Sequence, residues 1–321
     1  MRLLVPFVAL SFAIVGVPAA AQSWPSGPVK LVVPYGPGST PDIMARLLAE
    51  KMAPRIGQPV VVENKAGAAG HIGTDAVAKA KPDGQTIGLS IAGPLAVNTL
   101  LFKRMPYDPE RDLQPVTIAA TQPSVLVAAP KLNIGSTSEL MALLKANPGK
   151  YNYSSMGGGS ISHLAMEAIA AKSGAQLVHV AYPGSAPAVL ALLSGDVEVA
   201  CLPAAAVMPH VKAGKLKALA VATEKRSASL PDVPTLAEGG VRDVSADAWM
   251  GVILPAGTPE AIVKRVHDEV AAVLADREVR AKLQAQYMDV VANTPDEFRA
   301  TMKADVERWK PVIEKNRIAL D

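Results

Sequence analysis

The sequence has few of the residues that carry redox, metal and nucleic-acid chemistry. Its 321 residues include one cysteine, Cys201, so neither an internal disulfide nor a cysteine-based metal site can form. Aromatic residues make up 4% and charged residues 19%, the formal net charge is +3, and no block of Lys or Arg occurs, which argues against nucleic acid as the main partner. The five histidines are scattered, without an H-E-x-x-H motif. We therefore expect no metal and no cofactor.

Hydrophobic residues make up half of the sequence, enough for the core of one large domain or of two domains. At the N-terminus, a short positive start and an apolar stretch interrupted by prolines lead to Ala19 and Ala21, which form an A-x-A pattern before Gln22. This predicts a signal peptide over residues 1–21 and export to the periplasm. A membrane anchor is the alternative, but the apolar stretch is short for one.

Strand-like and helix-like patterns alternate along the rest of the chain, which predicts an α/β fold with parallel sheets covered on both faces. The apolar runs 31–34 and 60–63 are typical of buried parallel strands. Two such series predict two domains, one of residues 23–122 plus 247–321 and one of residues 123–246. The C-terminal helices are assigned to the first domain because they lack a sheet of their own.

A glycine-rich loop, "YGPGSTPD" from Tyr35 to Asp42, separates the first strand from the first helix. It is not a dinucleotide fingerprint, because Pro41 stands at the third glycine position, and no Gly-Lys-Ser/Thr follows to make a P-loop. We expect Thr40 to cap the helix and Asp42, in its first turn, to cap the amides instead of facing a ligand. The free amides of such a helix start favour an anion, although a well-capped helix without a ligand is the alternative.

Two later loops repeat the arrangement of strand, glycines, hydroxyl residues and helix, at residues 154–164 and 181–189, with Ser185 as the expected cap of the second helix. Glycines let the backbone approach a ligand closely and direct several amides at it. If the first loop lies on one domain and the other two on the second, the helix starts face each other across a cleft. Such a cleft suits a small molecule with one or two carboxylates.

An enzyme is the competing hypothesis. Ser160 precedes His163 by three residues, so an exported serine hydrolase that uses this pair is the second reading. The segment 158–162 lacks the final glycine of the G-x-S-x-G nucleophile elbow, and two residues one turn apart on one helix do not make a triad. His179 is expected to be structural, and no acid–base pair stands out. Substrate turnover would distinguish the enzyme from a binding protein.

Several motifs in order resemble the Bug family, the periplasmic substrate-binding receptors of tripartite tricarboxylate transporters. They include "YGPGSTPD", "GQPVVVENKAGAAGHIGTDAVAKAKPDGQT", "MPYDPERDLQPV", "KYNYSSMGGGSISHL", "VHVAYPGSAPAV", "LPDVPTLAE" and "PAGTPE". The resemblance implies a two-domain Venus-flytrap fold of the periplasmic binding proteins, with an organic acid bound in the interdomain cleft without a metal. It also implies delivery of the acid to membrane permease subunits, and we expect a monomer.

The resemblance places the ligand-binding residues on the three glycine loops. They are Tyr35, Gly36, Pro37, Gly38, Ser39, Thr40, Gly157, Gly158, Gly159, Ser160, His163, Pro183, Gly184, Ser185 and Ala186. Leu202 and Pro203 stand where the family often carries an Asp-Asn pair in the cleft. This departure removes polar groups from one wall. The sequence does not name the acid, nor does it distinguish delivery to a permease from presentation to a sensor.

Overall fold

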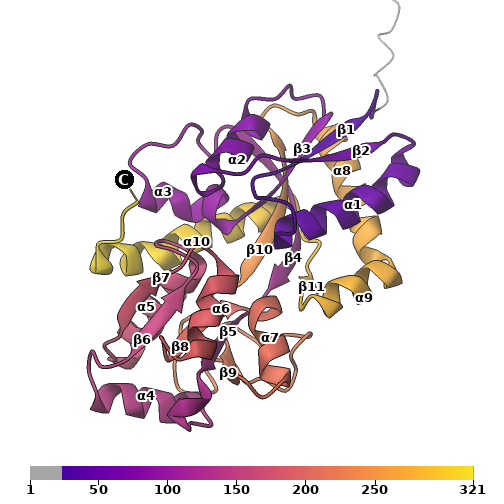
Figure 1. Cartoon of the computed structure of the whole chain (residues 1–321). Helices are drawn as coiled ribbons and strands as arrows, with labels where there is room; N and C mark the ends of the chain where they lie inside the picture. The colour runs from indigo at the N-terminus through magenta and orange to yellow at the C-terminus, as the bar shows by residue number, and fades with distance from the viewer. Residues whose placement is uncertain (1–23, 321) are drawn as a thin grey trace, which may run out of the picture.

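Two separate β-sheets organise residues 24–320, the part of the chain that the computed structural model describes (Figure 1). The predicted signal peptide, residues 1–21, lies outside this range. The first sheet has the strand order β11-β4-β10-β3-β1-β2, formed by β1 (Val29–Val33), β2 (Val60–Asn64), β3 (Thr86–Ile91), β4 (Leu113–Gln122), β10 (Ala248–Pro255) and β11 (Asp289–Val290). The second sheet has the order β7-β6-β8-β5-β9, formed by β5 (Ser124–Ala128), β6 (Asn152–Ser155), β7 (Val178–Ala181), β8 (Val199–Pro203) and β9 (Lys217–Val221).

Both sheets are mixed, so the prediction of parallel sheets is wrong for part of each. Strand β1 runs parallel to β2 and β3, and β6 runs parallel to β7 and β8, as expected. Strand β10, however, is antiparallel to β3 and β4, and β5 is antiparallel to β8 and β9. A parallel pair needs a crossover that returns the chain to the same end of its sheet. Strand β5 has none before it, because it enters the second sheet directly from β4.

The helices cover the faces of both sheets. The first sheet carries η1 (Ala68–Gly70), η2 (Gly93–Val97), α1 (Thr40–Ile56), α2 (His71–Ala78), α3 (Asn98–Leu101), α8 (Glu260–Ala275) and α9 (Arg277–Ala285). The second carries η3 (Pro130–Leu132), α4 (Thr137–Ala146), α5 (Ile161–Ser173), α6 (Ser185–Ser194) and α7 (Ala204–Lys212). Over residues 24–320, none of the helices combines the length and the apolar character that a membrane crossing requires.

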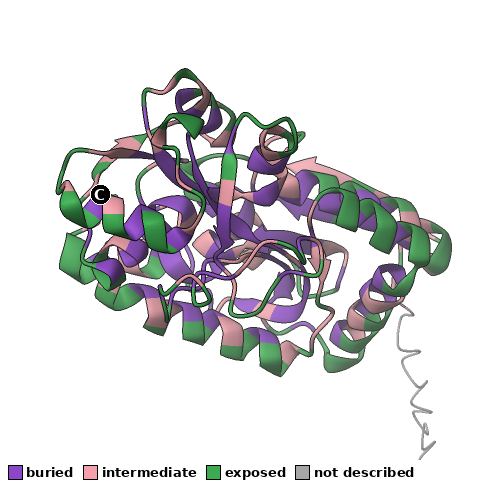
Figure 2. Cartoon of the chain, turned by 90° about the horizontal axis from the view of Figure 1, so that it is seen from below, coloured by how far each residue is buried: buried purple, intermediate pink, exposed green. Residues whose placement is uncertain are grey.

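The hydrophobic core lies between the sheets and their helices. One cluster joins β1 and β3 to α1 and α8 through residues such as Leu31, Met44 and Val266. The second sheet has a cluster on each face, one around Tyr153 and Leu164 and one around residues of α6 and α7. Figure 2 shows the buried strands in purple, enclosed by helices whose outer faces are exposed. Each sheet thus has a core of its own, as the two strand–helix series predict.

The chain passes between the sheets by a very short connection and by a long one. Only Pro123 separates the end of β4 from the start of β5, whereas residues 222–247 lead back from β9 to β10. The last helix, α10 (Pro295–Asn316), begins with a capping box between Thr294 and Glu297. Its Phe298 packs in a cluster with residues of the first sheet, while its Trp309 packs in the cluster of α5 and the second sheet. Helix α10 therefore lies against both halves of the molecule (Figure 1).

A candidate ligand-binding cavity between the two sheets

A cavity of about 680 Å³ lies where elements of the two sheets meet. The loop after β1 and the start of α1 form one wall, and the starts of α5, α6 and α7 form the opposite wall. The ends of β4 and β8 and the start of β10 contribute Gln122, Pro203, Ala248 and Met250 between those walls. The starts of four helices thus line one cavity, as expected for strands whose carboxyl ends point to a common site.

The cavity brings together residues from all three predicted loops. The residues of the predicted set that line it are Tyr35, Gly38, Ser39, Thr40, Gly158, Gly159, Ser160, Gly184 and Ser185. The others lie beside the cavity or beneath its wall, without lining it, and these are Gly36, Pro37, Gly157, His163, Pro183 and Ala186. The glycine loops are therefore correctly placed around one space, while the role of each residue in binding stays a prediction.

The buried carboxylate of Asp42 holds the first loop by a hydrogen bond, without lining the cavity itself. Its side chain is 2% exposed, and its carboxylate accepts hydrogen bonds from the Gly38 amide (2.8 Å), the Asn64 side chain (2.9 Å) and Arg46 (3.0 Å). Burial raises the pKa of Asp42, but the hydrogen bonds from Arg46, Gly38 and Asn64 outweigh it and lower the pKa below its usual range. The expected cap at Thr40 is wrong by one residue: Ser39 is the N-cap, and it makes no side-chain capping bond. Asp42 takes up the loop amide in its place.

The second loop satisfies most of its own amides. Ser160 is the N-cap of α5, and its hydroxyl accepts from the His163 amide (3.3 Å) and donates to the Gly157 carbonyl (2.6 Å). The amide of Gly159 donates to the His163 ring at Nδ1 (3.0 Å). The Ser160 hydroxyl is thus bound to the Gly157 carbonyl, and no hydrogen bond joins it to the His163 ring within residues 24–320. This geometry does not support the serine hydrolase reading.

Behind this loop, His163 belongs to a buried stack of rings. Its ring lies parallel to that of His179, with centroids 3.9 Å apart, and His179 stacks in turn on Tyr153. Burial, together with the neighbouring His179, lowers the pKa of His163 to about 4, so this ring is neutral at pH 7. The stack places His163 beneath the loop, and His179 has the structural position that the sequence indicates.

The third loop leaves its helix uncapped. Gly184, with φ of 116°, is the N-cap of α6, so the expected cap at Ser185 is wrong: Ser185 is the first helical residue, and no side chain caps the helix. Neither the Ser185 nor the Ala186 amide has an acceptor among residues 24–320. Helix α7 also starts at the cavity, after its N-cap Pro203 and without a side-chain cap, but its first amide, that of Ala204, donates to the Pro123 carbonyl (2.9 Å). Because first-turn amides lack intrahelical partners, both helix starts can donate to an anion.

Four polar or strained positions in the cavity wall were not predicted. Ala69 lies in a loop of four consecutive residues with positive φ, from Gly67 to Gly70, and its carbonyl accepts from Asn98 (3.2 Å). Gln122 donates to the Gln286 carbonyl (2.9 Å), and both residues line the cavity. A signal for Asn98 and Gln122 is present in the sequence, because each is a polar residue at the end of an apolar run. No local signal marks Gln286.

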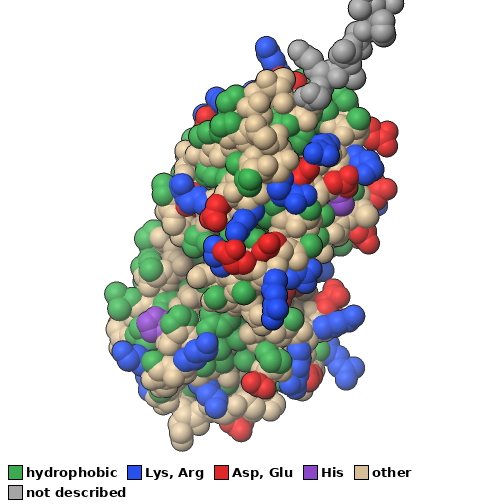
Figure 3. Space-filling view, turned by 90° about the vertical axis from the view of Figure 1, so that its right-hand side faces the viewer, with side chains coloured by type: hydrophobic (Ala, Val, Ile, Leu, Met, Phe, Trp, Pro, Cys, Tyr) green, Lys and Arg blue, Asp and Glu red, His purple; other side chains and the backbone are tan. Residues whose placement is uncertain are grey.

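Formal charge is absent from the wall of this cavity. Among residues 24–320, those that line it include no Asp, Glu, Lys, Arg or His. Its polar groups are hydroxyls, side-chain amides and backbone amides, and the hydroxyl oxygen of Ser39 is buried without a hydrogen-bond partner. The described part of the chain also contains no cluster of three or more His, Cys, Asp or Glu arranged to hold a metal ion. The charges in Figure 3 lie on the outer surface, where both signs are mixed.

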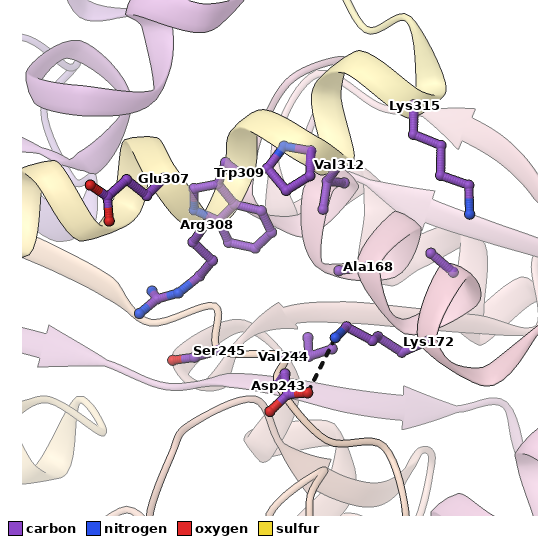
Figure 4. A pocket seen from close by; sticks show the side chains of 12 residues that line it. Ala168, Lys172, Asp243, Val244, Ser245, Glu307, Arg308, Trp309, Val312 and Lys315 are labelled. Carbon is purple, nitrogen blue, oxygen red and sulfur yellow. Dashed lines mark hydrogen bonds and ion pairs between the residues drawn. The ribbon is translucent and has the colours of Figure 1, made fainter.

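A second hollow of about 370 Å³ lies on the outside, between α10, α5 and residues 243–245 (Figure 4). Two of its cationic side chains have protein partners: Lys172 pairs with Asp243 (3.2 Å), and Arg308 pairs with Asp305 (2.8 Å). Trp309 forms part of its wall and belongs to the core around α5. The sides of α5 and α10 and residues 243–245 form its walls, and no helix starts in it.

Two sheets, each with its own core, a cavity between them and helix starts on both walls are the features of a two-lobed periplasmic binding protein. The protein BugT of Bordetella pertussis (strain Tohama I) is 38% identical over 316 residues, which cover 98% of this chain and 97% of BugT. The structure described as that of a periplasmic transporter has a TM-score of 0.81 at 38% identity and covers 93% of this chain and 100% of its own. R. palustris Rpa4515, solved with adipate, has a TM-score of 0.82 at 33% identity, with coverage of 92% and 99%.

The model of the tripartite tricarboxylate transporter family receptor matches residues 44–318. The chain therefore belongs to this family of transporter receptors, and the flytrap fold class expected from the sequence is confirmed.

Proposed function

We propose that this protein captures a small organic acid in the cavity between its sheets and delivers it to the membrane permease of a tripartite transporter. The observation that carries the proposal is the pair of helix starts, α6 and α7, that lack side-chain caps and lie at one cavity. Their amides and positive dipole ends attract a carboxylate. The adipate bound by R. palustris Rpa4515 supports an acid as the ligand.

The proposal extends to where and how the protein works. Its relatives are periplasmic binding proteins, which supports a periplasmic location after removal of residues 1–21. The two sheets support a division into one domain of residues 23–122 plus 247–321 and another of residues 123–246, closing on the ligand as a monomer. The protein returns its ligand unchanged, because it acts as a receptor and not as an enzyme.

A thermal-shift screen of mono-, di- and tricarboxylates tests the proposal. An acid present at about 100 times its dissociation constant should add about 2.7 kcal/mol to the free energy of unfolding. Absence of a shift with every acid, at concentrations up to the millimolar range, would contradict the proposal.

The variant Ser185→Asp then locates the anion. An acid in the first turn of α6 stabilises the helix by complementing its dipole, but it places a negative charge where the carboxylate would bind. Calorimetry should show at least a tenfold loss of affinity for the acid, with folding retained. Ser185→Asn is the matched neutral control. If both variants bind as the parent does, the start of α6 is not the anchor.

A further inference from the structure

The segment that follows α10 returns the chain to the cavity between the sheets. Arg317 comes directly after the helix and adopts the left-handed conformation, with φ of 51°. The Ile318 amide then donates to the Ile313 carbonyl (3.0 Å), which closes the turn at the end of the helix. Residues 318–320 run back toward α3 (Figure 1). Leu320, the last residue that the structure describes, is one of the residues that line the cavity.

Leu320 lies between the two halves of the molecule. Its amide donates to the carbonyl of Leu101 (3.0 Å), the last residue of α3 in the first half. Its side chain lies against the loop before α5 in the second half: a Cβ on Gly159 would be 3.0 Å from Leu320 Cδ1, and a Cβ on Gly158 would be 3.5 Å from Cδ2. Because both loop residues are glycines, the leucine can lie directly against the loop backbone.

The two apolar residues of this segment have different surroundings. Ile318 packs against the hydrophobic cluster around α5 and so fixes the segment on the protein. Leu320 lines the cavity and is 38% exposed. When the hydrocarbon part of a ligand covers an exposed leucine at a cavity, both apolar surfaces leave water, which is favourable. Leu320 is therefore in position to contact the body of a bound acid.

On the basis of the proposed function, we infer that residues 318–320 form a strap across the α3–α5 side of the cavity and that Leu320 retains the bound acid. The strap contacts Leu101 in the first half and the loop of Gly159 in the second. A rotation that separates the halves therefore has to break one of these contacts before the acid can leave. The strap thus slows the dissociation of the acid, and dissociation is the rate through which most affinity differences between related complexes arise.

The variant Leu320→Ala tests the inference by calorimetry and stopped-flow kinetics. The probe is the acid that gives the largest shift in the thermal-shift screen, with adipate as the first acid tried. We expect at least a fivefold loss of affinity, mainly through faster dissociation, with folding retained. Leu320→Met conserves the volume of the side chain and should stay within twofold of the parent. Leu190→Ala, at a leucine that is 64% exposed on α6 and outside the cavity wall, is the matched control and should bind as the parent does.

The outcomes separate the inference from the proposed function. If the parent binds an acid and Leu320→Ala binds it with the same affinity and dissociation rate, the inference is overturned and the proposed function stands. If no acid of the screen binds the parent, the proposed function fails and the retention role of Leu320 fails with it.

Hydrogen exchange without any ligand provides the second measurement. A chain shortened to end at Arg317 keeps α10 and lacks the strap. Peptides that cover residues 156–161 should exchange at least threefold faster in the shortened chain, because Leu320 no longer covers the loop. The loop around Gly184, where a Cβ would meet nothing within 4 Å, is the internal control and should exchange as before. Unchanged exchange over residues 156–161 would show that the strap does not protect the loop and would overturn the inference.

Discussion

Replacing Asp42 by alanine should destabilise the protein without lowering its affinity for a ligand. The carboxylate of Asp42 is buried and holds the cavity loop through the Gly38 amide and the first sheet through the Asn64 side chain. It also accepts from Arg46, whose side chain is 55% exposed. The variant Asp42→Ala removes all three hydrogen bonds at once.

The size of this destabilisation depends on which hydrogen-bond partners each of the three donors retains in the variant. Hydrogen bonds to charged groups contribute about 1.5–3 kcal/mol each, but the exposed Arg46 contributes less than about 1 kcal/mol because water solvates it. Asn64 retains its bond to the Tyr35 carbonyl (2.9 Å), and the exposed Gly38 amide regains water. We therefore expect a loss of about 3 kcal/mol in the free energy of unfolding, measured by urea unfolding and circular dichroism. Arg46→Ala, which removes only the exposed partner, should cost less than about 1 kcal/mol.

The pH dependence gives an independent check. The pKa of Asp42 is lower in the folded protein than in the unfolded chain, so its stabilisation is complete above the unfolded pKa. It is lost as the pH falls below the ordinary pKa of 3.8 and through the lower pKa of the folded protein. Asp42→Asn should lack this component. Affinity for an acid should change by no more than a few fold. A tenfold gain in affinity with unchanged stability would show that the carboxylate faces the ligand, and would refute the reasoning.

Three further predictions concern the second loop and the core. Gly159→Ala should cost about 1–3 kcal/mol, because Gly159 has φ of 71° and a Cβ would lie 2.8 Å from Leu101 Cδ1, whereas the exposed Gly158→Ala should be tolerated in urea unfolding. Because the pKa of His163 falls from 6.5 to about 4 on folding, the parent should lose about 2 kcal/mol between pH 7 and pH 5, and His163→Asn should lose clearly less. Burial raises the pKa of Cys201 to about 12, so thiol reagents at pH 8 should label it only after unfolding, and rapid native labelling would contradict its buried position.

Helix boundaries were the most predictable part of the fold. Helix α1 starts within one residue of its expected cap, since Pro41 suits a first turn, and Gly57 ends the helix in the left-handed conformation. Helix α9 was not predicted, because only Val279 and Leu283 of its nine residues are buried and the rest give no periodic apolar face. Strands β5 and β10 were expected, but their antiparallel direction was not. Their direction is set by where the chain crosses between sheets, which no local pattern records.

The glycine loops of the site could be read from the sequence, because glycines and hydroxyl residues at a helix start have local causes. The cap at Ser185 was misplaced, since a glycine before the helix can adopt the N-cap conformation as well as a serine can. The contact between Gln122 and Gln286 joins residues 164 positions apart and depends on how β11 and the preceding loop pack against β4. Such a contact follows from tertiary structure alone.

The single residue between β4 and β5 limits how the two halves can move. Consecutive Cα atoms are about 3.8 Å apart, so Gln122 and Ser124 stay within about 7.6 Å of each other in every conformation. In any rotation of one half against the other, residues next to this connection would move least. The displacement of other residues would grow with their distance from it. The loops of Gly38 and Gly184, which lie away from the connection, would be displaced further by the same rotation of the two halves. A rotation about this connection would therefore widen the mouth of the cavity while leaving the residues next to Pro123 nearly in place.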